Sequence, residues 1–156
     1  MKYMSTKTYG HEAGLSAVFR QPRADGHCNL LHGYALAVSI TFCADELDDR
    51  NWVQDFGGLK SVKAFLQDNF DHKLLVAFDD PMKDELCALG GLGLADPVVL
   101  PAVGCEAFAD YIFAWASEWL YHEQAEATPF APAQRVKVWS VTVAEHSGNS
   151  ATRVAA

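Results

Sequence analysis

The chain has 156 residues, 50% of them hydrophobic and 21% charged, a balance typical of a globular protein that buries its own core. Its net charge of −8 argues against a nucleic-acid partner, although a few local Arg or Lys side chains could still hold an anionic small molecule. No apolar run reaches the ~18 residues that cross a bilayer, and the N-terminus lacks the apolar segment of a signal peptide. We therefore expect one cytoplasmic domain, residues 1–156, with free cysteines and no membrane partner.

The first part of the chain has the alternating pattern of β-structure. Residues 3–20 predict a long strand that is bent or bulged at its two glycines, and residues 21–26 predict a loop. Residues 32–42 alternate between apolar and small or polar side chains, which predicts a half-buried antiparallel strand. His32 and Tyr34 share its apolar face, so we expect both to point toward the core or a pocket.

Two amphipathic helices are expected next. Apolar residues recur at three- and four-residue spacing over residues 56–70, and Asp55 is a suitable N-cap. The following stretch is less regular and predicts only a short helix ending near Leu89 and a brief strand at residues 98–100. The second amphipathic helix covers residues 105–121.

The last part of the chain returns to β-structure. A loop over residues 123–134 precedes a strand over residues 135–145, a turn, and a short edge strand at residues 150–154. Two long helices thus lie between two pairs of strands. We expect an α+β fold, with a four-stranded antiparallel sheet and both helices on one face.

Reactive side chains are concentrated after residue 26, where His27, Cys28 and His32 lie within six residues. Cys28 could act as a nucleophile or proton shuttle if a metal or a neighbouring imidazole gave it thiolate character. The alternative is a small buried apolar residue, which suits the other three cysteines better.

Four short motifs are spread along the chain. They are residues 28–34 (Cys-Asn-Leu-Leu-His-Gly-Tyr), 52–60 (Trp-Val-Gln-Asp-Phe-Gly-Gly-Leu-Lys), 70–75 (Phe-Asp-His-Lys-Leu-Leu) and 141–145 (Val-Thr-Val-Ala-Glu). In this order they resemble the 6-pyruvoyl-tetrahydropterin synthase and 6-carboxy-tetrahydropterin synthase family. The resemblance implies the tunnelling fold, sites formed between subunits, and a homohexamer of two stacked trimers.

The resemblance also implies a catalytic set of Cys28, Asp71 and His72, in which the carboxylate orients the imidazole as a general base. Because neighbours on a strand point to opposite faces, the Asp71–His72 pair requires a turn or a helix end. Without the resemblance, this pair is a surface Asp-His at a helix terminus.

Glu145 corresponds to the glutamate that anchors the pterin in the family. A pterin presents two parallel N–H donors, which a carboxylate can accept in bidentate fashion. Glu145 shares a strand face with the apolar Val141 and Val143, where burying a carboxylate without a partner costs free energy. The alternative is that the strand end reaches solvent and the carboxylate is hydrated there. Glu106 corresponds to a second family glutamate, although an acid in the first turn of a helix is also favoured by the helix dipole.

The family's zinc site uses three histidines, and this chain departs from it. Phe19 and Tyr34 stand at two of the three positions, and only His32 remains. A catalytic zinc takes three protein ligands, so one imidazole is too few. Either His27 and His11 rebuild a displaced zinc site with His32, or the metal is lost; Tyr34 could also be a weak ligand.

We therefore expect a lyase that acts on 7,8-dihydroneopterin triphosphate or a related pterin, by triphosphate elimination and side-chain rearrangement or cleavage. By analogy, the context is a bacterial route toward queuosine-type deazapurines. The alternative is a metal-free pterin- or purine-binding homologue without synthase activity. A third reading is a structural homologue with an unrelated ligand.

Overall fold

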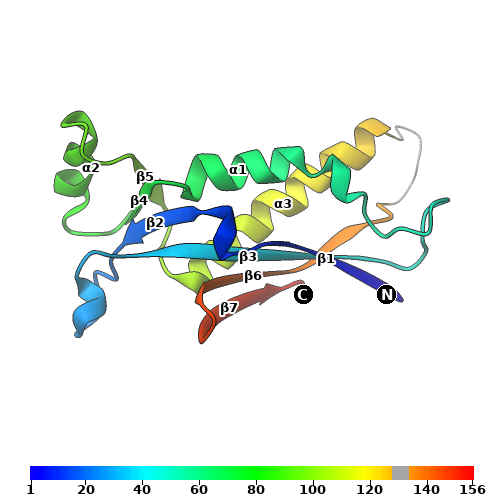
Figure 1. Ribbon diagram of the computed structural model, residues 1–156, viewed down its shortest axis with the longest axis horizontal. Helices are drawn as coiled ribbons and strands as arrows, with labels where there is room; N and C mark the ends of the chain where they lie inside the picture. The colour runs from blue at the N-terminus through cyan, green and yellow to red at the C-terminus, as the bar shows by residue number, and fades with distance from the viewer. Residues whose placement is uncertain (128–133) are drawn as a thin grey trace.

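The computed structural model describes residues 1–127 and 134–156, and Figure 1 shows how their elements are arranged. The described strands are β1 (Tyr3–Tyr9), β2 (Leu15–Phe19), β3 (His32–Ala44), β4 (Lys73–Ala77), β5 (Pro97–Leu100), β6 (Lys137–His146) and β7 (Asn149–Val154). The α-helices are α1 (Lys60–Phe70), α2 (Lys83–Gly91) and α3 (Cys105–Ala127), and the 3₁₀ turns are η1 (His11–Ala13), η2 (His27–Asn29) and η3 (Phe56–Gly58). None of the described helices is both long enough and apolar enough to cross a membrane.

β3 is the central strand of the sheet. One of its edges pairs antiparallel with β1 and with β2, and the other edge pairs with β6, which pairs in turn with β7. Beyond β2 come β4 and β5, and both of these pairings are parallel. The predicted α+β class is confirmed, but the predicted four-stranded antiparallel sheet is wrong, because the sheet has seven strands and is mixed.

β4 is a strand that the sequence pattern does not predict. All four residues from Leu74 to Ala77 are buried. A strand buried on both faces lacks the alternation of a half-buried strand, and a run this short is ambiguous on periodicity alone. By pairing with both β2 and β5, β4 extends the antiparallel part of the sheet with a parallel part.

α1 and α3 lie across the same side of the sheet (Figure 1). α3 contributes Phe108, whose ring meets the ring of Phe19 edge-on at 5.1 Å and that of Phe70 at 5.6 Å. These aromatic contacts join α3 to β2 and to the end of α1. The core continues over the alternating face of β3, where four side chains are fully buried: Leu36, Val38, Ile40 and Phe42.

The prediction of one long strand over residues 3–20, bent or bulged at its glycines, is wrong in one respect: the strand is broken in two there. β1 ends at Tyr9, η1 follows, and β2 begins at Leu15. Gly14 closes η1 with φ 74°, a left-handed conformation that favours glycine. Both halves of the interrupted strand pair antiparallel with successive stretches of β3, so the chain keeps its direction across the break and stays in the sheet.

α3 is longer than predicted. It runs to Ala127, so the predicted loop is wrong for residues 123–127. The helix continues because these residues, Glu-Gln-Ala-Glu-Ala, are strong helix formers without a breaker. Residues 128–133 of the predicted loop lie outside the described residues.

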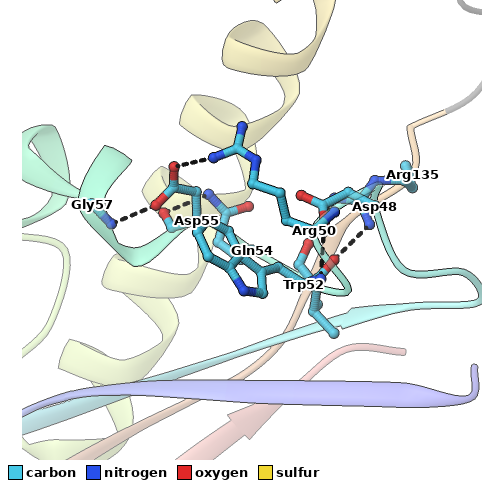
Figure 2. A network of polar contacts seen from close by, with 8 residues as sticks. Asp48, Arg50, Trp52, Gln54, Asp55, Gly57 and Arg135 are labelled. Carbon is cyan, nitrogen blue, oxygen red and sulfur yellow. Dashed lines mark hydrogen bonds and ion pairs between the residues drawn. The ribbon is translucent and has the colours of Figure 1, made fainter.

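The segment between β3 and α1 is held by a polar network (Figure 2). The carboxylate of Asp48 accepts hydrogen bonds from two backbone N–H groups, at 2.9 and 2.8 Å. Arg135 donates to three carbonyls of the segment, at 3.0, 3.3 and 2.8 Å. Asp55 accepts from the N–H of Gly57 at 2.8 Å, which confirms Asp55 as an N-cap, although of η3 rather than of α1.

Candidate active site

An open cleft of about 480 Å³ lies where η2, the start of β3, the N-terminus of α3 and the β6–β7 turn come together. Four separate elements contribute residues that the sequence analysis singled out, so only folding brings these residues together. The cleft is lined by five of them: His27, Cys28, His32, Glu106 and Glu145. His11, Asp71 and His72 do not line it.

Cys28 is an exposed residue of η2. The carbonyl of Cys28 accepts a hydrogen bond from the backbone N–H of Gln21 at 2.8 Å, which ties the turn to the residues that follow β2. The imidazoles of His27 and His32 line the same cleft as the thiol. An accessible thiol near imidazoles can act as a nucleophile or carry a proton.

Glu145, near the end of β6, lies beside Cys105, the first residue of α3. The Cys105 thiol lies close enough to both the backbone N–H and the carboxylate of Glu145 for each of them to shift its pKa. Burial, followed by the nearby charges of Glu145 and Glu106, raises the pKa of Cys105 to about 11. The thiol therefore stays protonated at neutral pH and can donate to the neighbouring carboxylate.

The sequence does not predict this role of Cys105, because its pattern indicates only a small buried apolar residue at this position. The residue is buried, as that interpretation requires. Its contact with Glu145, however, joins positions 40 residues apart (105 and 145), and no local pattern indicates it. In this part of the chain, the sequence indicates a site residue only at the neighbouring Glu106, through its correspondence to a family glutamate.

Aromatic rings form one wall of the cleft. Phe19 and His32 are partners in the β2–β3 register, and their ring centroids are 4.9 Å apart. Tyr34 lies 5.7 Å from His32 and 6.2 Å from Phe19. Burial, together with the nearby Glu145 and two cleft thiols, raises the pKa of Tyr34, so its phenol stays protonated and can donate a hydrogen bond.

The residues present do not fit a three-histidine zinc site. The Nδ1 of His32 contacts the Leu30 carbonyl at 2.7 Å, which leaves Nε2 as its free ligand atom. The Nδ1 of His11 contacts the Ala35 carbonyl at 2.5 Å, and Ala35 is about 10 Å along β3 from His32. His27 and His32 therefore share the cleft without His11.

The described residues contain no group of three or more His, Cys, Asp or Glu side chains arranged to hold a metal ion. The two rings nearest to His32 across the wall, those of Phe19 and Tyr34, lack an imidazole nitrogen. We therefore assign no chemical step to zinc in this cleft.

Asp71 and His72 form the predicted pair, but in a different groove. Asp71 is the C-cap residue of α1, and its Oδ1 lies 2.6 Å from Nδ1 of His72. His72 has φ 56°, a left-handed conformation that turns its ring back toward the carboxylate. The ring is 85% exposed and faces a groove that also contains Lys73 and Asp96. Tyr34 borders both this groove and the cleft of Cys28.

Comparison with known proteins gives a consistent family. A family model described as 6-pyruvoyl tetrahydropterin synthase matches residues 10–155. The 6-carboxy-5,6,7,8-tetrahydropterin synthase of Aquifex aeolicus is 29% identical over 97 residues, which cover 55% of this chain and 60% of that protein. The protein of the same name from Bacillus subtilis is 36% identical over 76 residues, covering 48% and 50%. The chain thus aligns with about half of the length of these relatives.

Solved structures show the same fold. An uncharacterized protein from Wolinella succinogenes matches with a TM-score of 0.75 and 19% identity, covering 97% of both chains. The 6-pyruvoyl tetrahydropterin synthase of Plasmodium falciparum matches with a TM-score of 0.63 and 15% identity, covering 96% of both chains. At these identities, the likeness concerns the fold alone.

Proposed function

The chain belongs to the 6-pyruvoyl tetrahydropterin synthase family, and from this premise we propose that it is a lyase acting on 7,8-dihydroneopterin triphosphate or a close relative. The observation that carries the proposal is the cleft shared by Glu145 and Cys28, since it combines a carboxylate that can hold a pterin with an accessible thiol. Two curated relatives are named 6-carboxy-tetrahydropterin synthases, which favours a 6-carboxy product and the queuosine-type context.

In the proposed complex, Glu145 accepts two parallel hydrogen bonds from the pterin ring N–H and the exocyclic NH₂. The protonated thiol of Cys105 keeps the carboxylate oriented for this contact. Glu106 lies in the same cleft and can accept a further hydrogen bond from the substrate.

Cys28 then moves protons on the pterin side chain. One of the cleft imidazoles, His27 or His32, takes the thiol proton, and the thiolate removes a proton from the side chain. The triphosphate leaves with the electron pair of its bond to the side chain. Asp71 and His72 lie in another groove of this chain, so we propose that they serve a site formed with a neighbouring subunit.

The charge of the cleft supports a site completed by another subunit. No Lys or Arg is among the described residues that line it, whereas Glu106 and Glu145 both do. A triphosphate requires cationic or N–H donors. We therefore propose that the triphosphate points away from the two glutamates, toward a neighbouring subunit of a homohexamer.

A second candidate function is metal-free binding of a pterin or purine without synthase turnover. It is favoured by one observation, the aromatic rings of Phe19 and Tyr34 beside His32. This reading keeps the Glu145 anchor and the donor phenol of Tyr34. It requires neither a zinc ion nor Cys28 as a reactive group.

Turnover and binding together distinguish the two candidates. We expect the wild type to consume 7,8-dihydroneopterin triphosphate, and Cys28→Ser to stop turnover while still binding a pterin. Glu145→Gln is expected to weaken pterin binding about 10- to 100-fold, the value of a hydrogen bond to a charged group. Glu118→Gln changes an exposed glutamate of α3 outside the cleft and serves as the matched control.

The two candidate functions predict different results. If the wild type consumes no substrate with or without added zinc, but binds a pterin in the presence of a chelator, the second candidate replaces the first. If neither a pterin nor a purine binds, both candidates are wrong.

A further inference from the structure

Arg20, the residue after β2, connects three segments of the chain through one side chain. Its Nε donates to Oδ2 of Asp80 at 2.9 Å and its Nη2 donates to Oδ1 of Asp80 at 3.2 Å, a bidentate pair. Its Nη1 donates to the carbonyl of Asn29 at 3.2 Å. Asn29 is the last residue of η2, so the guanidinium joins the segment between β4 and α2 to the turn that carries Cys28.

Asp80 is a fixed support for this arrangement. Its side chain is 1% exposed, and its Oδ1 also accepts from the N–H of Met82 at 2.8 Å. Burial alone would raise the pKa of Asp80, but the hydrogen bonds from Arg20 and Met82 and the charge of Arg20 outweigh it and lower the pKa. Asp80 is therefore charged at neutral pH, and both of its carboxylate oxygens accept hydrogen bonds. Only the planar fork of an arginine can reach Asp80 and the Asn29 carbonyl together.

The turn η2 has few other constraints. In the part of the chain that the structure describes, Arg20 makes the one side-chain hydrogen bond to it. The backbone adds the bonds Asn29 N–H to Gly26 O and Leu30 N–H to His27 O, both 3.0 Å, and the bond from Gln21 to Cys28. A turn of three residues held by so few bonds opens easily without a tertiary contact.

A second ion pair joins nearly the same two segments on the surface. Arg23 contacts Asp79, and the two side chains are 84% and 45% exposed. Exposed pairs contribute little, because water screens them and both side chains lose entropy. Arg23 and Asp79 therefore provide an internal control for Arg20 and Asp80, whose side chains are 19% and 1% exposed.

We propose that Arg20, supported by Asp80, is a positioning residue that keeps the Cys28 thiol in the cleft it shares with Glu145. The inference rests on the proposed function in one respect, namely that Cys28 is the reacting group. A reacting atom must be held within a narrow range of geometry, and a small displacement lowers the rate without removing any catalytic group. This clamp, formed by Arg20 and Asp80, acts through the backbone of η2 and does not touch the substrate.

The first measurement is amide hydrogen exchange of residues 27–30. Arg20→Ala leaves the buried charge of Asp80 unpaired and can unfold the chain, so the main variant is Arg20→Gln combined with Asp80→Asn, which removes both charges. We expect its exchange in η2 to be faster by about tenfold, as for loss of a charged hydrogen bond. Arg23→Ala is expected to leave it unchanged. Equal exchange in the wild type and the double variant would overturn the proposal.

The second measurement is steady-state turnover. In the double variant we expect kcat to fall about tenfold with KM nearly unchanged, since the pterin anchor is intact. Faster exchange with unchanged kcat would overturn the positioning role. If the wild type itself has no turnover, the proposed function fails, while hydrogen exchange still tests the clamp.

Discussion

Phe19 and His32 face each other across the β2–β3 pair, with their rings 4.9 Å apart. Tyr34, two residues further along β3, points to the same face and completes the wall. The family resemblance places zinc ligands at these three positions. The positions therefore converge in this chain, while two of the three side chains cannot supply an imidazole nitrogen.

This geometry predicts that zinc binding can be restored by two substitutions. Phe19→His combined with Tyr34→His would give three imidazoles on one face of β2 and β3, and we expect about one zinc per chain. Metal analysis of protein purified without chelators measures this, with the wild type expected to contain none. The same double variant with His32→Ala should also contain none. A zinc in the wild type that is lost in His32→Ala would contradict the prediction and indicate a rebuilt site that includes His27.

The contact between Cys105 and Glu145 predicts a modest loss of ligand affinity when the thiol is removed. Cys105→Ala deletes the donor to the carboxylate, so we expect pterin binding to weaken about 2- to 10-fold, with partial recovery in Cys105→Ser. Fluorescence titration with a pterin measures the affinity. Cys43→Ala is the control, because this other buried thiol donates to the Lys137 carbonyl, away from the cleft. Equal weakening in both variants would mean a general loss of packing.

The raised pKa of Cys105 also predicts selective thiol chemistry. Its thiol is buried and protonated until the pH approaches about 11, whereas Cys28 is exposed. Between pH 7 and 9 we expect iodoacetamide to modify Cys28 in the native protein and to leave Cys105 unmodified. Peptide mass analysis after short labelling identifies the modified residues. Modification of Cys105 at a rate similar to that of Cys28 would show that the cleft wall opens readily.

The Arg20–Asp80 pair predicts a specific acid sensitivity. The pKa of Asp80 in the folded chain lies below its ordinary value of 3.8, so its contribution to stability is complete above that pH and is lost as the pH falls through the folded value. Urea unfolding should show the wild type more stable than Asp80→Asn at pH 5–7, with the difference shrinking below about pH 4. Asp79→Asn, at the exposed pair, should show almost no difference at any pH. A constant difference for Asp80→Asn down to pH 2 would contradict the assignment.

The burial of Phe108 predicts how much the packing of α3 against the cleft wall contributes to the free energy of unfolding. It is fully buried against Phe19 and Phe70, so Phe108→Ala should lower the free energy of unfolding by about 3–5 kcal/mol. Denaturant unfolding measures this loss. Phe78→Ala is the matched control, since Phe78 is 67% exposed and its removal should cost no more than about 0.5 kcal/mol. A small loss for Phe108→Ala would mean that α3 can adjust around the cavity.

Much of the fold follows from local patterns in the sequence. The alternation of β3 and the spacing of α1 repeat at the periods of the two kinds of element, and the glycines at 10 and 14 mark the break between β1 and β2. β4 could not be predicted in this way, because its four consecutive buried residues show no alternation of buried and exposed side chains. The full length of α3 is not predicted, because the prolines that indicate a loop over residues 123–134 come only after the helix has ended.

Four motifs in order point to the family before any folding is considered, and they mark Cys28 and Glu145 as candidate site residues. Motifs of this kind are local, so they can be read without knowing how the chain folds. Which candidates meet depends on how the chain folds. Folding places Glu145 and Cys28 in one cleft and puts Asp71 and His72 in another groove. It also brings Cys105 beside Glu145, and Arg20 into contact with Asp80. Arg20 and Asp80 are 60 positions apart. Contacts between residues so distant along the chain arise from the packing of whole elements, which no periodicity of a single segment records.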